Sequence, residues 1–185
     1  MNGPRGRDAL RAFYGDVRVV YDEGSRTWML DPVGWEGINC VVVTDLPGLD
    51  GRKLYVNRKI LAPLRTALTL ATMRCPEYKI ESIACFNPRP TRPAIRRLEK
   101  AGALVDGASA TWGTGLSFHS VAAAIDVNPT RNAMRTATSR TEVWWDIPEP
   151  FFQAFRDSGW TCGVDFGAGD PTPTRDPMHF QYGAL

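Results

Sequence analysis

Hydrophobic positions along the chain follow two different periods, one helical and one typical of strands. Apolar residues recur at helical spacing through "RKILAPLRTALTLATMR", which predicts an amphipathic helix over residues 58–74. Short β-branched or apolar runs bounded by turn residues predict strands over residues 38–46, 54–57 and 78–86. The elements do not alternate regularly as βαβ units, so the pattern predicts an α+β fold.

A further strand is predicted within "VAAAIDVNP", residues 121–129. Ile125 and Val127 flank Asp126, so on a strand they face the core while Asp126 points the other way. The alanines two and four residues before Asp126 share its face, which leaves that face shallow and open.

The stretch "MHFQY", residues 178–182, has the same design. Met178, Phe180 and Tyr182 fall on one face of a strand, and His179 and Gln181 fall on the other. Two strands therefore each present a possible metal ligand on the face opposite their apolar residues.

The chain of 185 residues is long enough to bury one core, and no linker divides it. We expect a single domain over residues 1–185, with a surface extension rich in Gly, Arg and Asp over residues 1–34 and a core over residues 35–185. The pattern also predicts a proline-held loop over residues 87–93, a short helix over residues 94–102 and a flexible connection over residues 106–115.

Composition argues against a nucleic-acid-binding protein and against a membrane-spanning one. A net charge of +2 is too small to argue for nucleic acid, and no apolar run approaches the roughly 20 residues of a membrane span. The basic first residues lack the apolar stretch of a secretory signal, so we expect a cytoplasmic protein unless another route releases it. Four cysteines without a C-x-x-C pair predict buried apolar residues: Cys40, Cys75, Cys85 and Cys162.

The two histidines of the chain suggest a metal site. His119 precedes Asp126 by seven residues, about 10 Å along a helix and opposite faces on a straight strand. Both reach one metal only if His119 lies on a turn leading into the Asp126 strand. With His179 they form a His, Asp, His set, and catalytic zinc uses three such ligands. Asp176, three residues before His179, then suits a general base.

Ordinary structural roles compete with this interpretation. A histidine among apolar neighbours is more often a packed or surface residue than a ligand. Asp176 in "TRDPM" and Asp126 before "NPT" also suit turns. Spacing alone leaves both interpretations open.

Two motifs resemble those of a known family. "SFHSVAAAID" matches the pattern S-x-H-x-x-G-x-A-x-D at Ser117, His119, Ala124 and Asp126, and "DPMHF" has an acidic residue, Asp176, three before His179. Both patterns are typical of the VanY-like zinc D-alanyl-D-alanine carboxypeptidases and L-alanyl-D-glutamate endopeptidases, which include many phage endolysins. "GWEGINCVVV", "VNRKILAPLRTAL", "ACFNPRPTR" and "AIDVNPTRNAM" resemble the endopeptidase branch, so the resemblance covers about residues 35–185.

The resemblance implies a small antiparallel sheet that carries the zinc site between flanking helices, as in VanY and hedgehog-like folds. It also implies an arginine that contacts the substrate carboxylate or the developing oxyanion, because a guanidinium stays charged and offers a planar fork of donors. Arg89 is the preferred candidate and Arg92 the other. The implied zinc ligands are His119, Asp126 and His179, the implied general base is Asp176, and Ser117 is expected to support the site or its turn.

Three departures from the family pattern bear on specificity. Ala122 replaces the family glycine, and "GWTCGVDFGAGD" matches the tryptophan- and glycine-rich stretch loosely, with Asp165 and Phe166 as possible wall residues. Residues 93–116 form a longer connection than the family pattern leads us to expect, either a lid, a substrate-selecting loop or inert surface.

The resemblance implies a monomeric zinc peptidase that acts on the bacterial peptidoglycan stem peptide. The endopeptidase-like segments favour a phage lysin that hydrolyses the L-alanyl-D-glutamate bond and stays in the cytoplasm until lysis. A D-alanyl-D-alanine carboxypeptidase is the alternative enzyme. A non-catalytic wall-binding module or phage tail component that keeps the fold is the alternative from another class.

Overall fold

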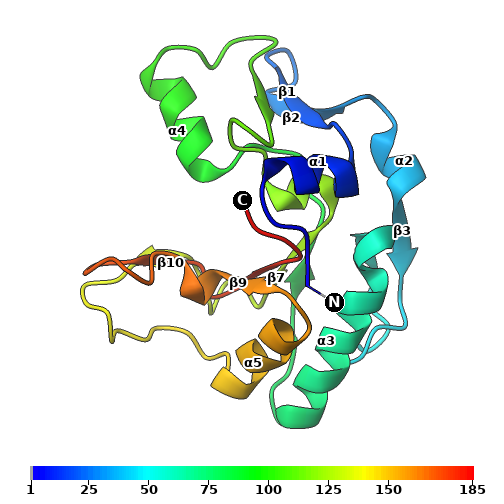
Figure 1. Cartoon of the computed structure of the whole chain (residues 1–185), viewed down its shortest axis with the longest axis vertical. Coiled ribbons are helices and arrows are strands. Elements are labelled where there is room, and N and C mark those ends of the chain that lie inside the picture. The colour runs from blue at the N-terminus through cyan, green and yellow to red at the C-terminus, as the bar shows by residue number, and fades with distance from the viewer. Residues whose placement is uncertain (1) are drawn as a thin grey trace.

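The computed structural model describes residues 2–185, whose elements are traced in chain order in Figure 1. The helices are α1 (Arg7–Tyr14), α2 (Trp35–Asn39), α3 (Leu61–Arg74), α4 (Arg92–Lys100) and α5 (Glu149–Asp157), with 3-10 turns η1 (Arg58–Ile60), η2 (Phe118–Val121) and η3 (Gly163–Asp165). The strands are β1 (Arg18–Asp22), β2 (Thr27–Asp31), β3 (Cys40–Val43), β4 (Leu54–Asn57), β5 (Ile83–Ala84), β6 (Ser109–Thr111), β7 (Ala124–Val127), β8 (Arg135–Thr136), β9 (Thr161–Cys162), β10 (Thr174–Arg175) and β11 (His179–Gln181).

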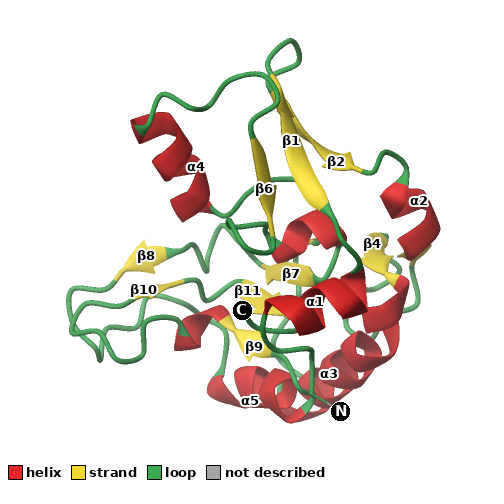
Figure 2. Cartoon of the chain, turned by 45° about the horizontal axis from the view of Figure 1, so that its top comes forward, coloured by secondary structure: helices red, strands yellow, loops and turns green. Residues whose placement is uncertain are grey.

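A four-stranded antiparallel sheet in the order β5-β7-β11-β9 forms the centre of the molecule. Helices α3 and α5 pack against each other below it in the view of Figure 2. Phe180 of β11 is fully buried against α5, with its ring centroid 5.8, 5.6 and 4.3 Å from those of Phe151, Phe152 and Phe155. This aromatic cluster anchors the reverse side of the strand that carries His179.

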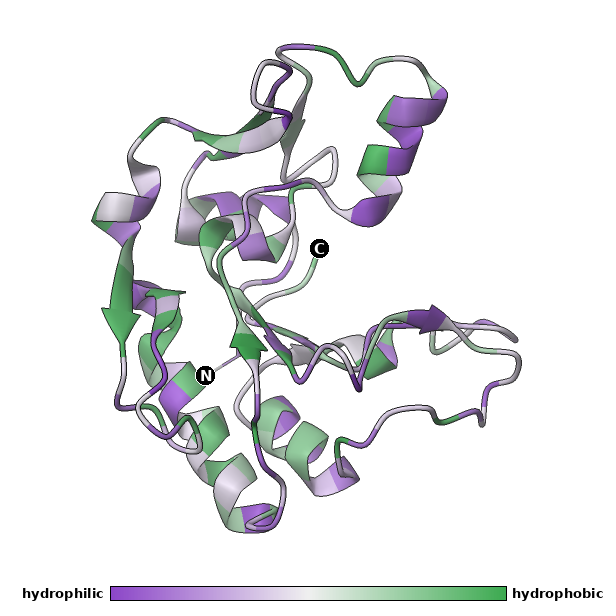
Figure 3. Ribbon diagram, turned by 180° about the vertical axis from the view of Figure 1, so that it is seen from behind, coloured by the Kyte–Doolittle hydropathy of each residue, from purple (hydrophilic) through white to green (hydrophobic). Residues whose placement is uncertain are grey.

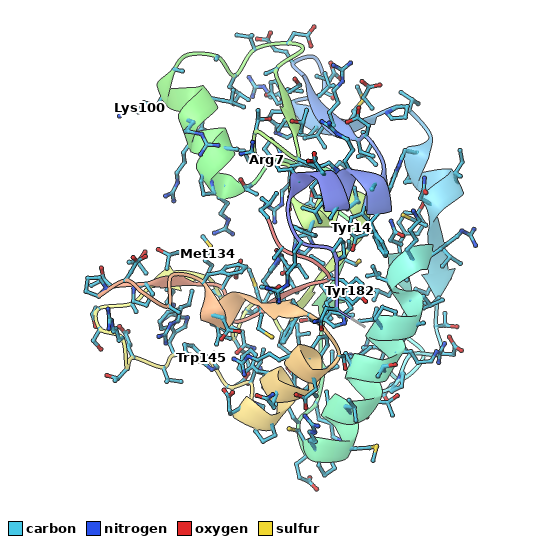
Figure 4. The ribbon with its side chains drawn as sticks, in the orientation of Figure 1. Arg7, Tyr14, Lys100, Met134, Trp145 and Tyr182 are labelled. Atoms are coloured by element: carbon cyan, nitrogen blue, oxygen red, sulfur yellow. The ribbon has the colours of Figure 1, made fainter. Side chains whose placement is uncertain are left out.

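Three smaller sheets surround the central one. Strands β2, β1 and β6 form an antiparallel sheet, β3 pairs with β4, and β8 pairs with β10. The β8–β10 ribbon projects away from the body in Figure 3, on the same side of the molecule as α4. In Figure 4, Met134 and Trp145 lie in this projecting part, and Lys100 lies at the far end of α4.

The observed elements confirm the predicted α+β class. The expected helix over residues 58–74 is η1 followed by α3, and the expected strand over residues 54–57 is β4. The strand expected over residues 38–46 is shorter, because α2 extends through residue 39.

Only Ile83 and Ala84 form a strand within residues 78–86. The amides of Glu81 and Ser82 donate instead to the Asn128 side chain, at 2.8 and 3.0 Å. These amides are therefore satisfied outside any strand ladder, which shortens the predicted element.

The N-terminal segment is built into the core, which differs from the expected surface extension over residues 1–34. Helix α1 buries Leu10 and Tyr14, and the Tyr14 hydroxyl donates to the main-chain carbonyl of Tyr182 at 2.5 Å. Figure 4 shows these two tyrosines close together where α1 meets the C-terminal segment. Strand β6 pairs with β1, so part of the expected flexible connection over residues 106–115 is also ordered in a sheet.

The four cysteines are free and buried, as predicted. Within residues 2–185, no helix combines the length and the hydrophobicity that crossing a membrane requires.

Replacing Leu10 with alanine tests the packing of the N-terminal segment. Leu10 is 0 % exposed, so Leu10→Ala is expected to lower the free energy of unfolding by about 2–5 kcal/mol. Leu185 is 62 % exposed, so Leu185→Ala is the matched control and should change stability by less than about 0.5 kcal/mol. Urea unfolding followed by circular dichroism measures both, and equal midpoints would contradict the packing of α1 in the core.

Candidate metal centre

Two antiparallel strands, β7 and β11, bring two of the candidate ligands face to face. In their register His179 lies opposite Asp126, and Phe180 lies opposite Ile125. Ile125 and Phe180 are fully buried, whereas Asp126 is only partly buried. The alternation of side chains therefore directs the apolar pair into the core and the polar pair to the other face of the sheet.

The turn η2 delivers His119 to the same face. The Ser117 side chain accepts a hydrogen bond from the His119 amide at 3.3 Å and caps the turn. The turn ends at Ala122, whose backbone is left-handed with φ 49° and ψ 37°. His119 thus lies on a turn that leads into the Asp126 strand, the arrangement that its spacing requires.

The alternation predicted that Ala122 lies on the strand with Asp126, and this prediction is wrong. Strand β7 begins at Ala124, and Ala122 lies before it in the left-handed conformation that favours glycine. Both alanines are 0 % exposed, so the expected shallow, open face is filled at these positions. A glycine would adopt this left-handed backbone without strain, whereas the alanine adopts it at some cost.

The three ligand atoms form a nearly equilateral triangle. His119 Nε2 lies 3.1 Å from His179 Nδ1 and 3.2 Å from Asp126 Oδ1, and His179 Nδ1 lies 3.2 Å from the same oxygen. Tetrahedral zinc with bonds of about 2.0–2.1 Å separates neighbouring ligand atoms by about 3.3 Å. The spacing of the triangle therefore fits zinc, and the group could hold a metal ion.

The outer nitrogen of each histidine has a partner outside the triangle. His119 Nδ1 lies 2.6 Å from the main-chain carbonyl of Cys85, which can only accept, so this nitrogen carries the proton. His179 Nε2 lies 2.9 Å from the side-chain oxygen of Gln181. In these neutral tautomers His119 Nε2, His179 Nδ1 and Asp126 Oδ1 direct lone pairs at one another, so the cluster favours a positive charge, either a proton on one of the rings, which then donates to Asp126, or a metal ion.

The electrostatics of the cluster favour that cation. Burial by itself would raise the pKa of Asp126, but hydrogen bonds with His119 and His179 hold it well below its usual value. Burial by itself would lower the pKa of His179, but Asp126 raises it above its usual value. Negative charge at Asp126 is thus retained in a largely buried place, where it attracts either a proton or a metal ion.

Asp176 lies beside this cluster on the segment that leads into β11. Its Oδ1 atom is buried and has no hydrogen-bond partner among the described residues. Burial raises the pKa of Asp176 above its usual value, against the opposing charge of His179. A carboxylate oxygen that is buried but not hydrogen-bonded is available to exchange a proton with a bound molecule.

Gly163 allows Asp176 to approach so closely. The Asp176 amide donates to the Gly163 carbonyl at 2.9 Å, and a Cβ atom on Gly163 would stand only 2.1 Å from the Asp176 carbonyl oxygen. The Asp176 carbonyl in turn accepts from the His179 amide at 2.9 Å. One glycine therefore sets the place of the acidic residue and of the turn before His179.

Both candidate arginines lie where their charge reaches the carboxylates. Burial lowers the pKa of the half-buried Arg89, while Asp126 and Asp176 act to raise it. Arg92 is exposed, and its charge acts on Asp176. Ser120 holds the Arg89 main chain from both sides, because its hydroxyl accepts from the Arg89 amide at 2.9 Å and donates to the Arg89 carbonyl at 2.7 Å.

The two residues proposed as walls of the site, Phe166 and Asp165, have different surroundings. The ring of Phe166 lies 5.9 Å from that of His179, as a wall residue would, whereas Asp165 forms an ion pair with Arg156. The long connection over residues 93–116 contains α4 and β6, so part of it belongs to a sheet and the connection as a whole is not a free lid.

Sequence reasoning missed several residues that position the site. Ser120 acts through its hydroxyl and Gly163 through its lack of a side chain, each on the main chain of a distant residue, and one sequence has no periodic signal for such contacts. The alternation of β11 did place Gln181 on the face of His179, but the direction of its amide could not be inferred.

Residues 89–182, just over half of the chain, match the family model of the D-alanyl-D-alanine carboxypeptidases, peptidase M15. No curated protein matches the chain, and no solved structure matches it. The matched region holds both histidines and both aspartates of the site, along with both arginines, and the family supports a metallopeptidase. The chain belongs to the D-alanyl-D-alanine carboxypeptidase family.

Proposed function

We propose that this protein is a zinc-dependent peptidoglycan peptidase of the endolysin type, which hydrolyses the L-alanyl-D-glutamate bond of the stem peptide. The observation that carries the proposal is the triangle of three lone-pair donors, 3.1–3.2 Å on a side, with the unpartnered Oδ1 atom of Asp176 nearby. The family match supports the metallopeptidase chemistry.

His119, Asp126 and His179 are the proposed zinc ligands. Zinc bound by them supplies a Lewis acid for the peptide carbonyl and lowers the pKa of water toward about 7. Asp176 takes a proton from the attacking water as the new C–O bond forms. It returns that proton to the leaving nitrogen as the C–N bond breaks, which yields a carboxylate and an amine.

An arginine is proposed to stabilise the negative charge that develops on the peptide oxygen. Arg89 is preferred over Arg92 because it is half-buried and its main chain is held by Ser120. A fixed guanidinium in a partly dehydrated place stabilises developing charge more strongly than a mobile, solvated one.

The second candidate is a D-alanyl-D-alanine carboxypeptidase, which the description of the matched family favours. The endopeptidase and endolysin role, with the protein held in the cytoplasm until lysis, rests on the resemblance of segments that lie mostly upstream of the matched residues, together with residues 124–134 inside them. In either case we propose one zinc peptidase domain that acts as a monomer on the stem peptide.

Digestion of purified peptidoglycan tests the proposal and separates the two enzymes. The zinc-loaded protein is incubated with defined muropeptides, and the products are identified by mass spectrometry. Stem peptides that begin at D-glutamate are expected, whereas release of free D-alanine would indicate the carboxypeptidase. Stoichiometric zinc with no turnover of any muropeptide would contradict both and support a non-catalytic wall-binding module.

Asp176→Asn tests the proposed base. The amide cannot take the proton from water, so turnover should fall by about 10²–10⁴-fold while zinc stays bound. His179→Ala should lose both zinc and activity. Asp170 is exposed, so Asp170→Asn is the control and should retain both. Metal analysis and initial rates measure the three variants, and an active Asp176→Asn enzyme would exclude this role.

Gly163→Ala tests the position of Asp176. The added methyl group would lie 2.1 Å from the Asp176 carbonyl oxygen, so the main chain must shift. Turnover is expected to fall by about 10–100-fold with zinc retained. Gly169→Ala is the control, because nothing lies within 4 Å of its Cβ position. Unchanged turnover in Gly163→Ala would show that the close contact between Gly163 and Asp176 does not position the Asp176 carboxylate.

Arg89→Ala and Arg92→Ala separate the two arginines. Loss of a charge that stabilises the developing oxyanion costs about 10²–10³ in kcat, and this loss is expected for Arg89→Ala. Arg92→Ala should change kcat much less, because its side chain is exposed. Steady-state kinetics on one muropeptide compares them, and the opposite order would assign the role to Arg92.

A further inference from the structure

The side-chain amide of Gln181 joins the metal centre to the main chain. Its Oε1 atom lies 2.9 Å from His179 Nε2, and its Nε2 atom donates to the Gly183 carbonyl at 3.0 Å. Gln181 stands two residues after His179 on β11 and shares its face, so the contact needs no unusual backbone.

The direction of this amide follows from the chemistry of its two neighbours. The Gly183 carbonyl can only accept, so the NH₂ group of Gln181 must face it. The oxygen of the same amide must then face His179, and an amide oxygen can only accept. His179 Nε2 therefore carries a proton, which leaves the lone pair of a neutral imidazole on Nδ1.

That lone pair points into the cluster. His179 Nδ1 lies 3.1 Å from His119 Nε2 and 3.2 Å from Asp126 Oδ1. The two histidines are held differently at their outer nitrogens, because His119 uses the Cys85 carbonyl and His179 uses a side chain. Only the second arrangement can be altered by substitution without changing the backbone.

We propose that Gln181 is a positioning residue that selects the tautomer and the ring orientation of His179 for metal binding. The inference rests on the proposed function in one respect, namely that His179 is a ligand. Without an acceptor at residue 181, a neutral His179 can place its proton on Nδ1, which then cannot bind a metal. Outer hydrogen bonds of this kind typically contribute 10–100-fold to metal affinity.

Two substitutions separate this role from simple packing. Gln181→Met keeps a long side chain but cannot accept a hydrogen bond, and Gln181→Glu keeps the acceptor. Competition with a chelator should show zinc affinity about 10–100-fold weaker in Gln181→Met and within about threefold of the wild type in Gln181→Glu. Gln153→Met on the exposed face of α5 is the matched control and should bind zinc as the wild type does.

Thermal unfolding without zinc accompanies these measurements. Equal melting temperatures of the wild type and Gln181→Met would show that the loss of affinity does not come from a damaged fold. Equal zinc affinity in the wild type and Gln181→Met, or equal losses in the Met and Glu variants, would overturn the inference.

A second readout does not depend on zinc. Nitrogen-15 NMR of the neutral imidazole at about pH 9, in metal-free protein, should show His179 protonated at Nε2 in the wild type and a tautomer mixture in Gln181→Met. If the wild type binds no zinc, the proposed function fails, and this spectrum still decides whether Gln181 selects the tautomer. A single Nε2–H tautomer in Gln181→Met would refute the role.

Discussion

The antiparallel pairing of β7 with β11 is the constraint on which the candidate metal centre depends. It places His179 opposite Asp126, and a shift of one residue would turn His179 toward the core and Phe180 toward the cluster. The aromatic rings of α5 prevent that shift, because Phe180 is fully buried among them. Hydrophobic packing on one side of the strand thus determines which side chains meet on the other.

The metal centre itself is a local conflict that the fold maintains. Three lone-pair donors lie within 3.1–3.2 Å of one another, and hydrogen bonds at the outer nitrogens keep them there. Such a group is unfavourable without a cation, because buried negative charge and facing lone pairs repel. The capped turn η2 and the packed sheet hold these groups in place, and this arrangement suits a positive ion.

The residues proposed to act on the peptide come from segments outside β7 and β11. Asp176 is held by the close approach of Gly163, and Arg89 is held by the Ser120 hydroxyl. Ser120 and His119 belong to the same turn, so one short segment positions a ligand with its side chain and an arginine through a neighbour. A change in η2 is therefore expected to affect the positions of both His119 and Arg89.

The sequence by itself determined the α+β class, the helix over residues 58–74, and the faces of the two strands that carry Asp126 and His179. Those features follow from periodicity, which is local. The candidate ligand set was also proposed from the sequence, because the chain has only two histidines and both lie in motifs that resemble those of the family. The burial of α1, the pairing of β6 with β1, the contact of Gly163 with Asp176 and the direction of the Gln181 amide required the tertiary structure. The first three depend on contacts between residues distant in the chain, and the last depends on which end of an amide faces which partner. Neither kind of contact produces a periodic pattern in one sequence.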